Sequence, residues 1–301
     1  MATLTVGYEK TYETPEAAIA AADTNDTIEI SSITGDPATL SLYWNTDFEN
    51  AKQLTFRGVG NVGFWMRVNR DNDTMTGVNV FENLTFLVDS RVRALSETIT
   101  SVTFRRCKWF QTNPSFGPFS INRENGYTQY ENCMISTPRN GWEFGANQQK
   151  LNLYNTTVYQ WTYGSPKTLV STAHANSIVN VYNCIIHGDG DSFDCLAGTL
   201  NEDYNVGQGL TGANDTNLTK TQAGFDMLAY GPFEFRVTQP YELPGTTNAN
   251  GVDLTTLYTT DIDGRPRTQY SIGCSEGFRL GGAAPGPVYS TNNVIFSTSQ
   301  E

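Results

Sequence analysis

The segment Phe81-Glu82-Asn83-Leu84-Thr85-Phe86 is the first of five similar stretches that follow one another along the middle of the chain. Each stretch places a polar residue, usually asparagine, directly before a small or apolar residue. The other four stretches are Phe104–Trp109, Tyr130–Ile135, Tyr154–Val158 and Tyr182–Ile186. Aligned on Leu84, Cys107, Cys133, Thr156 and Cys184, they are separated by steps of 23, 26, 23 and 28 residues. A repeat of this length indicates stacked structural units.

The length of each step suits one turn of a coil with three strands. Three strands of about five residues plus their corners use roughly this many residues, and insertions at the corners account for the unequal steps. Two further strand-like segments, 54–58 and 203–207, extend the series at either end. The sequence therefore predicts an all-β protein, a single-stranded right-handed parallel β-helix.

The alternation within each strand predicts which side chains face the interior of the coil. Leu84, Cys107, Cys133, Thr156 and Cys184 are expected to stack as a buried core ladder. The thiols are interpreted as core residues in preference to catalytic or metal-binding groups, because buried cysteine behaves as a small apolar residue. The recurring residues Asn83, Asn132 and Asn183 could form a second ladder through their side-chain amides.

The two ends of the chain differ from its middle. Thr14 is a plausible N-cap and Pro15 suits the first position of a short helix, which would cover the open end of the solenoid. We expect an N-terminal cap over residues 1–30, the β-helix over 31–276, and a Gly/Pro linker with an extended C-terminal tail over 277–301. The tail could add a strand to a neighbouring subunit or form a disordered end.

Several segments, taken in order, resemble a known superfamily. The stretches 7–28, 54–58 and 83–86 look like the entry and early coils of pectate-lyase-like β-helices, and 261–267 with 271–276 look like their closing motif, with Cys274 in place of the usual alanine. Together these segments cover most of residues 1–276. The resemblance implies the fold but no activity, because this fold hosts lyases, hydrolases, adhesins and inert structural proteins.

Composition narrows the classes of partner. The formal net charge of −12 argues against binding to nucleic acid, whose phosphates would be repelled. No stretch of about 18 apolar residues predicts a membrane span, and the first residues show no signal peptide. The five cysteines are widely spaced, which favours free thiols made in a host cytoplasm over zinc or a disulfide framework.

The densest acidic cluster contains Asp189, Asp191 and Asp194. These carboxylates could act as the acid and base of a glycosidase or could gather calcium, whereas a Gly/Asp-rich corner between coils explains them without chemistry. The sequence Arg265-Pro266-Arg267 does not match the spacing of the arginine motif in pectate lyases. Aromatic residues could line a sugar-binding groove or pack in the core or between subunits: Trp109, Phe110, Trp142, Tyr159, Trp161 and Tyr163.

Three functions compete at this point. The first is a non-enzymatic structural protein of a bacteriophage virion, a capsid decoration or head-surface protein that contacts other virion proteins and assembles as a homotrimer, with no metal or cofactor. The second is a tailspike-like polysaccharide depolymerase, for which Asp189, Asp191 and Asp194 are the candidate catalytic residues. The third is a glycan-binding adhesin. We rank the virion structural protein first, by analogy with other proteins of this fold.

Overall fold

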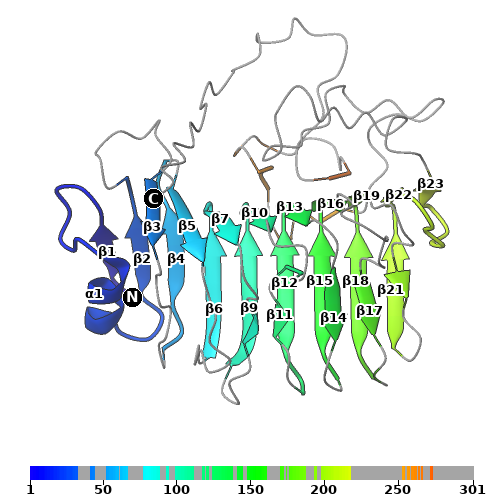
Figure 1. Ribbon diagram of the computed structural model, residues 1–301, viewed down its shortest axis with the longest axis horizontal. Coiled ribbons are helices and arrows are strands. Elements are labelled where there is room, and N and C mark those ends of the chain that lie inside the picture. Colours follow the sequence, from blue (N-terminus) through cyan, green and yellow to red (C-terminus); the bar gives the residue numbers. More distant parts are fainter. Residues whose placement is uncertain are drawn as a thin grey trace, which may run out of the picture.

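The computed structural model describes the chain in segments: residues 1–32, 41–44, 52–60, 62–66, 77–88, 93–94, 99–111, 117–118, 120–121, 124–137, 141–144, 148–160, 170–172, 174, 176–187, 193–194, 198–217, 253–254, 256–257, 259–262, 264, 266 and 272–273. Its strands stack along one axis from the N-terminal helix to the last coil (Figure 1).

Two long sheets of nine strands each form the body of the molecule. In spatial order, the first long sheet contains β1 (Thr3–Val6), β2 (Thr27–Ile30), β4 (Thr55–Gly58), β6 (Gly77–Glu82), β9 (Ile99–Arg105), β12 (Tyr127–Glu131), β15 (Lys150–Tyr154), β18 (Ile178–Tyr182) and β21 (Thr199–Asp203). The second long sheet contains β3 (Ser41–Trp44), β5 (Val62–Met66), β7 (Thr85–Val88), β10 (Lys108–Gln111), β13 (Met134–Thr137), β16 (Thr157–Gln160), β19 (Ile185–His187), β22 (Val206–Gly207) and β23 (Thr216–Asn217).

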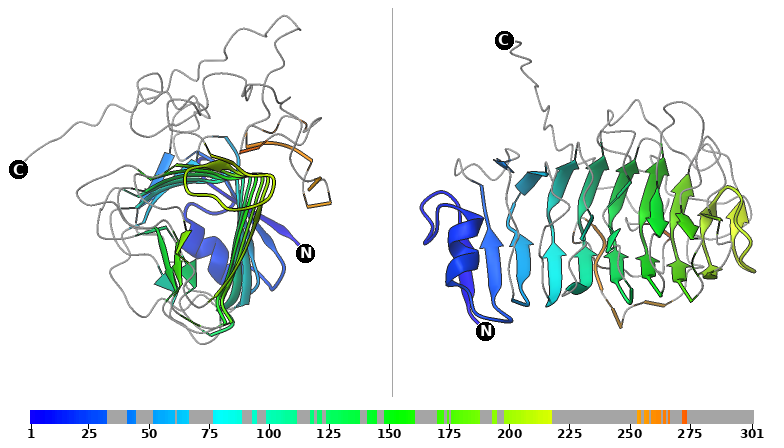
Figure 2. Two further views of the ribbon diagram at one scale, coloured as in Figure 1. Left: turned by 90° about the vertical axis from the view of Figure 1, so that its right-hand side faces the viewer. Right: turned by 60° about the horizontal axis from the view of Figure 1, so that its bottom comes forward.

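Shorter strands form two further sheets. One contains β8 (Arg93–Ala94) and β11 (Ser120–Ile121), and the other contains β14 (Trp142–Phe144), β17 (Val170–Thr172) and β20 (Phe193–Asp194). The strands within each of these sheets pair in parallel, as they do in the long sheets. Viewed along the stack, the sheets enclose an interior (Figure 2). The predicted parallel β-helix is confirmed.

The predicted N-terminal helix is present as α1 (Pro15–Ala21), beside β1 and β2 at the first end of the stack (Figure 1). The Thr14 hydroxyl accepts a hydrogen bond from the Ala17 backbone N–H at 3.3 Å, as an N-cap does. The last turn is also satisfied, because the Lys52 ammonium donates to the Ile19 and Ala20 carbonyls at 2.9 and 3.2 Å. Ile19 is buried, so the helix covers apolar surface that the first coil would otherwise expose.

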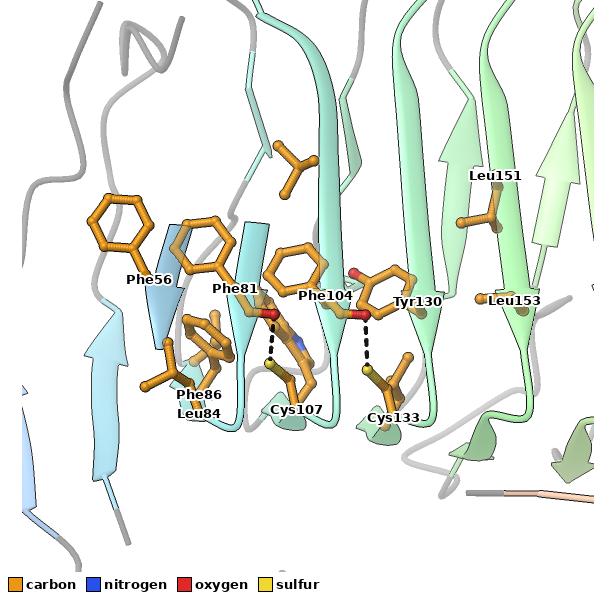
Figure 3. Packing of buried hydrophobic residues seen from close by; sticks show 14 of the residues in the cluster. Phe56, Phe81, Leu84, Phe86, Phe104, Cys107, Tyr130, Cys133, Leu151 and Leu153 are labelled. Atoms are coloured by element: carbon orange, nitrogen blue, oxygen red, sulfur yellow. Dashed lines mark hydrogen bonds between the residues drawn. The ribbon is translucent and has the colours of Figure 1, made fainter. Parts of the chain in front are cut away.

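The interior of the solenoid is a continuous apolar core. One part of it is a column of aromatic rings, Phe56, Phe81, Phe104 and Tyr130, one from each of four neighbouring strands (Figure 3). Successive ring centroids are 5.0, 5.3 and 4.9 Å apart, and the planes are nearly parallel. Parallel pairing in register repeats the same inward position at each rung, so like side chains stack on one another.

Tight turns connect the first long sheet to the second. One residue in each turn has a left-handed backbone conformation: Asn83, Arg106, Asn132, Asn155, Asn183 and Tyr204, with φ between 46° and 57°. Asparagine adopts this conformation more readily than most residues, which explains its recurrence in the sequence. Asn183 donates to the Asn155 side-chain oxygen at 3.4 Å, whereas Asn83 and Asn132 donate to backbone carbonyls. The expected bonding of side-chain amides from coil to coil is thus present at Asn83 and Asn183, although Asn83 reaches a backbone carbonyl instead of a second amide.

Two substitutions at one turn should separate backbone strain from hydrogen bonding. The Asn83 amide donates to the Gly58 carbonyl of the preceding coil at 2.8 Å. We expect Asn83→Gly to lose only this bond, about 1 kcal/mol of unfolding free energy. Asn83→Ala should lose about 1 kcal/mol more, because alanine is strained at positive φ. Chemical denaturation of both variants checks the order, and equal losses would contradict the strain at this turn.

Candidate functional site

The five predicted ladder residues lie in one buried column on the inner side of the turns. Leu84, Cys107, Cys133, Thr156 and Cys184 are all 2% exposed or less. Successive coils are joined there by backbone hydrogen bonds from Lys108 to Leu84, Met134 to Cys107, Thr157 to Cys133 and Ile185 to Thr156, at 2.9 to 3.1 Å. Each thiol also donates to a carbonyl of the preceding coil; Cys107 reaches Phe81 at 3.4 Å and Cys133 reaches Phe104 at 3.3 Å (Figure 3).

The environment of the thiols suits packing better than chemistry. Burial raises the pKa of the Cys133 thiol well above its ordinary value, and the neighbouring Cys107 adds to the effect. A thiolate is the reactive form of cysteine. Because all three thiols are 2% exposed or less, we expect Cys107, Cys133 and Cys184 to resist alkylation at pH 8 in the folded chain and to react on unfolding. Mass spectrometry of the labelled peptides measures this, and fast labelling of folded Cys133 would contradict it.

Charged side chains occupy the outer face of the first long sheet. Arg57, Glu82, Arg105 and Glu131 are in register on four successive strands; we call them the ionic column. Arg57 Nε lies 2.9 Å from Glu82 Oε2, and Arg105 Nε lies 2.6 Å from Glu131 Oε2. Arg106, from the adjacent turn, places Nη2 2.7 Å from Glu82 Oε1. The alternating charges thus pair between coils.

The arginines around Glu82 lower the pKa of its carboxylate. Burial opposes its ionisation, but hydrogen bonds and positive charge from Arg57 and Arg106 outweigh burial and lower the pKa. A general acid needs a raised pKa in order to hold its proton near neutral pH. Glu82 is therefore poorly suited to donate a proton to a substrate, and its arrangement is that of a structural ion pair.

A second column on the same face consists of side-chain amides. Asn201 donates to Asn180 at 2.8 Å, Asn180 donates to Asn152 at 2.7 Å, and Asn152 donates to Gln129 at 2.9 Å. Gln129 in turn donates to Glu131. We call these four amides the amide column. All of their N–H donors point toward the carboxylate of Glu131, so their dipoles align with its negative charge and strengthen one another.

Tyrosines flank the amide column. Tyr154 and Tyr182 stack across neighbouring strands with centroids 6.2 Å apart, and the Lys150 ammonium lies 5.8 Å from the centroid of the Tyr127 ring. We call Tyr127, Tyr154 and Tyr182 the tyrosine strip; each is partly exposed. Burial, followed by the charges of Tyr154 and Glu131, raises the pKa of Tyr127 to about 12 despite the hydrogen bond from Asn152. The strip therefore offers aromatic faces and hydroxyl groups.

Most of the candidate catalytic residues from the sequence fall outside the described part of the chain. Asp189 and Asp191 lie outside the described residues, and only the backbone of Asp194 is described, in β20. Arg265 and Arg267 lie outside as well. Among the described residues there is no group of three or more His, Cys, Asp or Glu side chains arranged to hold a metal ion. No helix in this part of the chain is long and apolar enough to span a membrane.

The aromatic residues singled out in the sequence are buried where they are described, and Trp109 and Trp142 belong to the core. Trp109, Phe110, Trp142 and Tyr159 are each 6% exposed or less, and Trp161 and Tyr163 lie outside the described residues. Sequence reasoning missed the tyrosine strip instead. Its signal was present, because Tyr154 and Tyr182 hold the same repeat position, two residues before Thr156 and Cys184. Alternation turns that position outward.

Comparison of the chain with protein-family models, with curated proteins and with solved structures finds no match in any of the three. The evidence for the fold is therefore the strand pairing of this chain, and the evidence for its function lies in the surfaces described above.

Proposed function

We propose that this chain is a non-enzymatic structural protein, a stiff β-solenoid whose setting is the surface of a bacteriophage head. The observation that carries the proposal is the pairing within the ionic column. Glu82 is held by Arg57 and Arg106, and Glu131 is held by Arg105 and Gln129. These pairs stabilise the outer face of the sheet, and the lowered pKa of Glu82 suits a scaffold better than a hydrolytic site.

Stiffness follows from the same pairing. Strands at about 4.8 Å spacing are joined by continuous backbone hydrogen bonds, and the ionic and amide columns add side-chain bonds between coils on the solvent side. Aromatic stacking joins the same coils on the inner side. A rod of this kind can bind a protein shell and reinforce it without chemistry.

The phage setting rests on the resemblance of the chain to pectate-lyase-like β-helices, a fold that virion proteins use. A net charge of −12 suits a soluble protein that docks on another protein rather than on nucleic acid. In this proposal the partners are capsid proteins and two further copies of the chain, in a homotrimer.

Electron microscopy of purified phage particles tests the setting. An antibody against the chain should label the heads, and the purified chain should rebind to heads from which it has been stripped. Label on tails alone, or a chain that does not co-purify with any particle, would overturn the proposal. Light scattering of the purified chain tests the trimer.

A glycan-binding adhesin is the second candidate, and the tyrosine strip favours it. Sugars stack their apolar faces on aromatic rings and bond their hydroxyl groups to amides. Tyr154 and Tyr182 lie beside Asn180 and Asn201 on the outer face of β15, β18 and β21. This arrangement offers both kinds of contact along one line.

Titration against surface polysaccharides distinguishes the candidates. An adhesin should lose about tenfold or more in affinity on Tyr182→Ala, since removing one stacking contact costs about 1.5 kcal/mol. Tyr8→Ala is the matched control, because Tyr8 is 54% exposed near the N-terminus. Cleavage of a polysaccharide by the protein would instead support the depolymerase, if that cleavage disappears in Asp189→Asn, Asp191→Asn or Asp194→Asn.

A further inference from the structure

The C-terminal part of the chain returns to the turns between the two long sheets. The Asn132 side-chain amide donates to the Thr260 carbonyl at 2.8 Å, and the Asn155 amide donates to the Gly273 carbonyl at 3.4 Å. These described pieces are drawn in orange beside the middle coils (Figure 1). Residues far beyond the last strand are thus held against coils in the middle of the solenoid.

One apolar contact anchors the returning segment. Ile262 is 6% exposed and packs on Met134, which is 1% exposed. This pair forms a cluster separate from the main core, on the outer side of the second long sheet. Ile262 lies within a turn that is closed by a hydrogen bond from the Gly264 N–H to the Asp261 carbonyl at 3.0 Å. Ile262 therefore gives the segment a fixed position along the sheet.

Gly273 is the tightest point of the contact. Its N–H donates to the Asn183 carbonyl at 2.6 Å, and its φ is +92°. A Cβ at this position would lie 2.7 Å from Ile185 Cδ1 and 3.0 Å from Thr157 Oγ1. Only glycine fits both the backbone conformation and the space. By contrast, Gly264 has a φ of +79°, and a Cβ added there would meet nothing within 4 Å.

These contacts differ from the rest of the fold in sequence separation. The side-chain bonds between neighbouring coils described above join residues 21 to 33 apart, from Asn201 to Asn180 up to Lys52 to Ile19. The bonds to Thr260 and Gly273 join residues 128 and 118 apart. Long loops close late and slowly compared with local ones, and such segments often open as separate units.

We propose that Thr260, Asp261, Ile262, Gly264 and Gly273 belong to a strap that docks on the completed solenoid as a separate cooperative unit. The docked strap holds Gly273 at the turns of Asn155 and Asn183. Undocking breaks these contacts and uncovers Met134 while the coils stay folded.

Hydrogen exchange on the full chain, read by mass spectrometry, tests the strap. In the unsubstituted chain, strap peptides should exchange more slowly than an unstructured chain. Gly273→Ala should speed their exchange by about tenfold or more, because the added methyl group clashes with β16 and β19. Peptides from β9, β12 and β15 should keep their protection. Gly264→Ala is the control for backbone strain: alanine is also strained there, at a φ of +79°, but its methyl group meets open space, so strap exchange should speed up clearly less than in Gly273→Ala.

A second pair of variants keeps the test decisive if Gly273→Ala does not fold. Asn132→Gly keeps the left-handed turn but removes the bond to Thr260, so it should also speed strap exchange. Asn83→Gly removes the equivalent amide from a turn that bonds to Gly58 and should leave the strap unchanged. Strap peptides that exchange freely in the unsubstituted chain would overturn the proposal. Equal loss of protection in strap and coils would also overturn it, because strap and solenoid would then be one unit.

Discussion

Phe104→Ala is expected to lower the free energy of unfolding by about 3–5 kcal/mol, as deletion of a buried aromatic side chain does. Phe104 is 2% exposed and lies between the rings of Phe81 and Tyr130, at centroid distances of 5.3 and 4.9 Å. Phe86 and Trp109 meet it nearly at right angles, at 5.6 and 5.7 Å. Alanine would open a cavity between all four rings. The hydrogen-bonded spacing of the coils prevents the walls from closing it.

Phe104→Leu is the control for this experiment. It keeps most of the volume and loses the ring stacking, so we expect a cost of about 1.5 kcal/mol. Denaturant titration followed by circular dichroism reports the strands, and fluorescence reports the tryptophans, including Trp109. A loss below about 1 kcal/mol for Phe104→Ala would show that the aromatic column is not tightly packed.

The fold could be predicted from the sequence because a solenoid repeats its environment at every coil. The same inward position returns after each step, so Cys107, Cys133 and Cys184 carry a signal that needs no knowledge of distant contacts. The helix at Pro15–Ala21 was equally readable, since an N-cap, a proline at the first position and a run of alanines are local features.

The outer columns were harder to predict because they depend on register. Arg57, Glu82, Arg105 and Glu131 become neighbours only when the unequal steps between coils are resolved into strand pairs. A shift of one residue would turn each of these side chains to the other face. The alternation is visible in the sequence, but the corner at which each extra residue is inserted is not.

The strap could not be predicted from periodicity at all. Its hydrogen bonds to the solenoid join residues 90 to 128 positions apart, and they use backbone groups such as the Thr260 and Gly273 carbonyls. Resemblance marked the segment as a closing motif, and the structure adds what it closes upon. The described residues of this part of the chain hold the turns at Asn132, Asn155 and Asn183.

Glu131→Ala is expected to cost about 3 kcal/mol of unfolding free energy. Glu131 is 2% exposed, accepts from Gln129, and pairs with Arg105 at 2.6 Å. Its loss removes hydrogen bonds to a charged acceptor and leaves the buried Gln129 amide without its acceptor, and each effect costs about 1–3 kcal/mol. The Arg105 side chain is 35% exposed, so water compensates in part for its lost partner. Thermal and denaturant unfolding measure the change.

Glu131→Gln and Glu29→Ala are the controls for the stability loss expected of Glu131→Ala. Glutamine keeps an acceptor for Gln129 but removes the charge opposite Arg105, so we expect a smaller cost, about 1–2 kcal/mol. Glu29 lies in the same register at the N-terminal end, on β2, and its replacement should change stability by less than about 0.5 kcal/mol. Carboxylates placed for catalysis are often strained, and their removal commonly stabilises a protein. A gain in stability for Glu131→Gln would therefore contradict the structural role of the ionic column and favour an enzymatic role for this face.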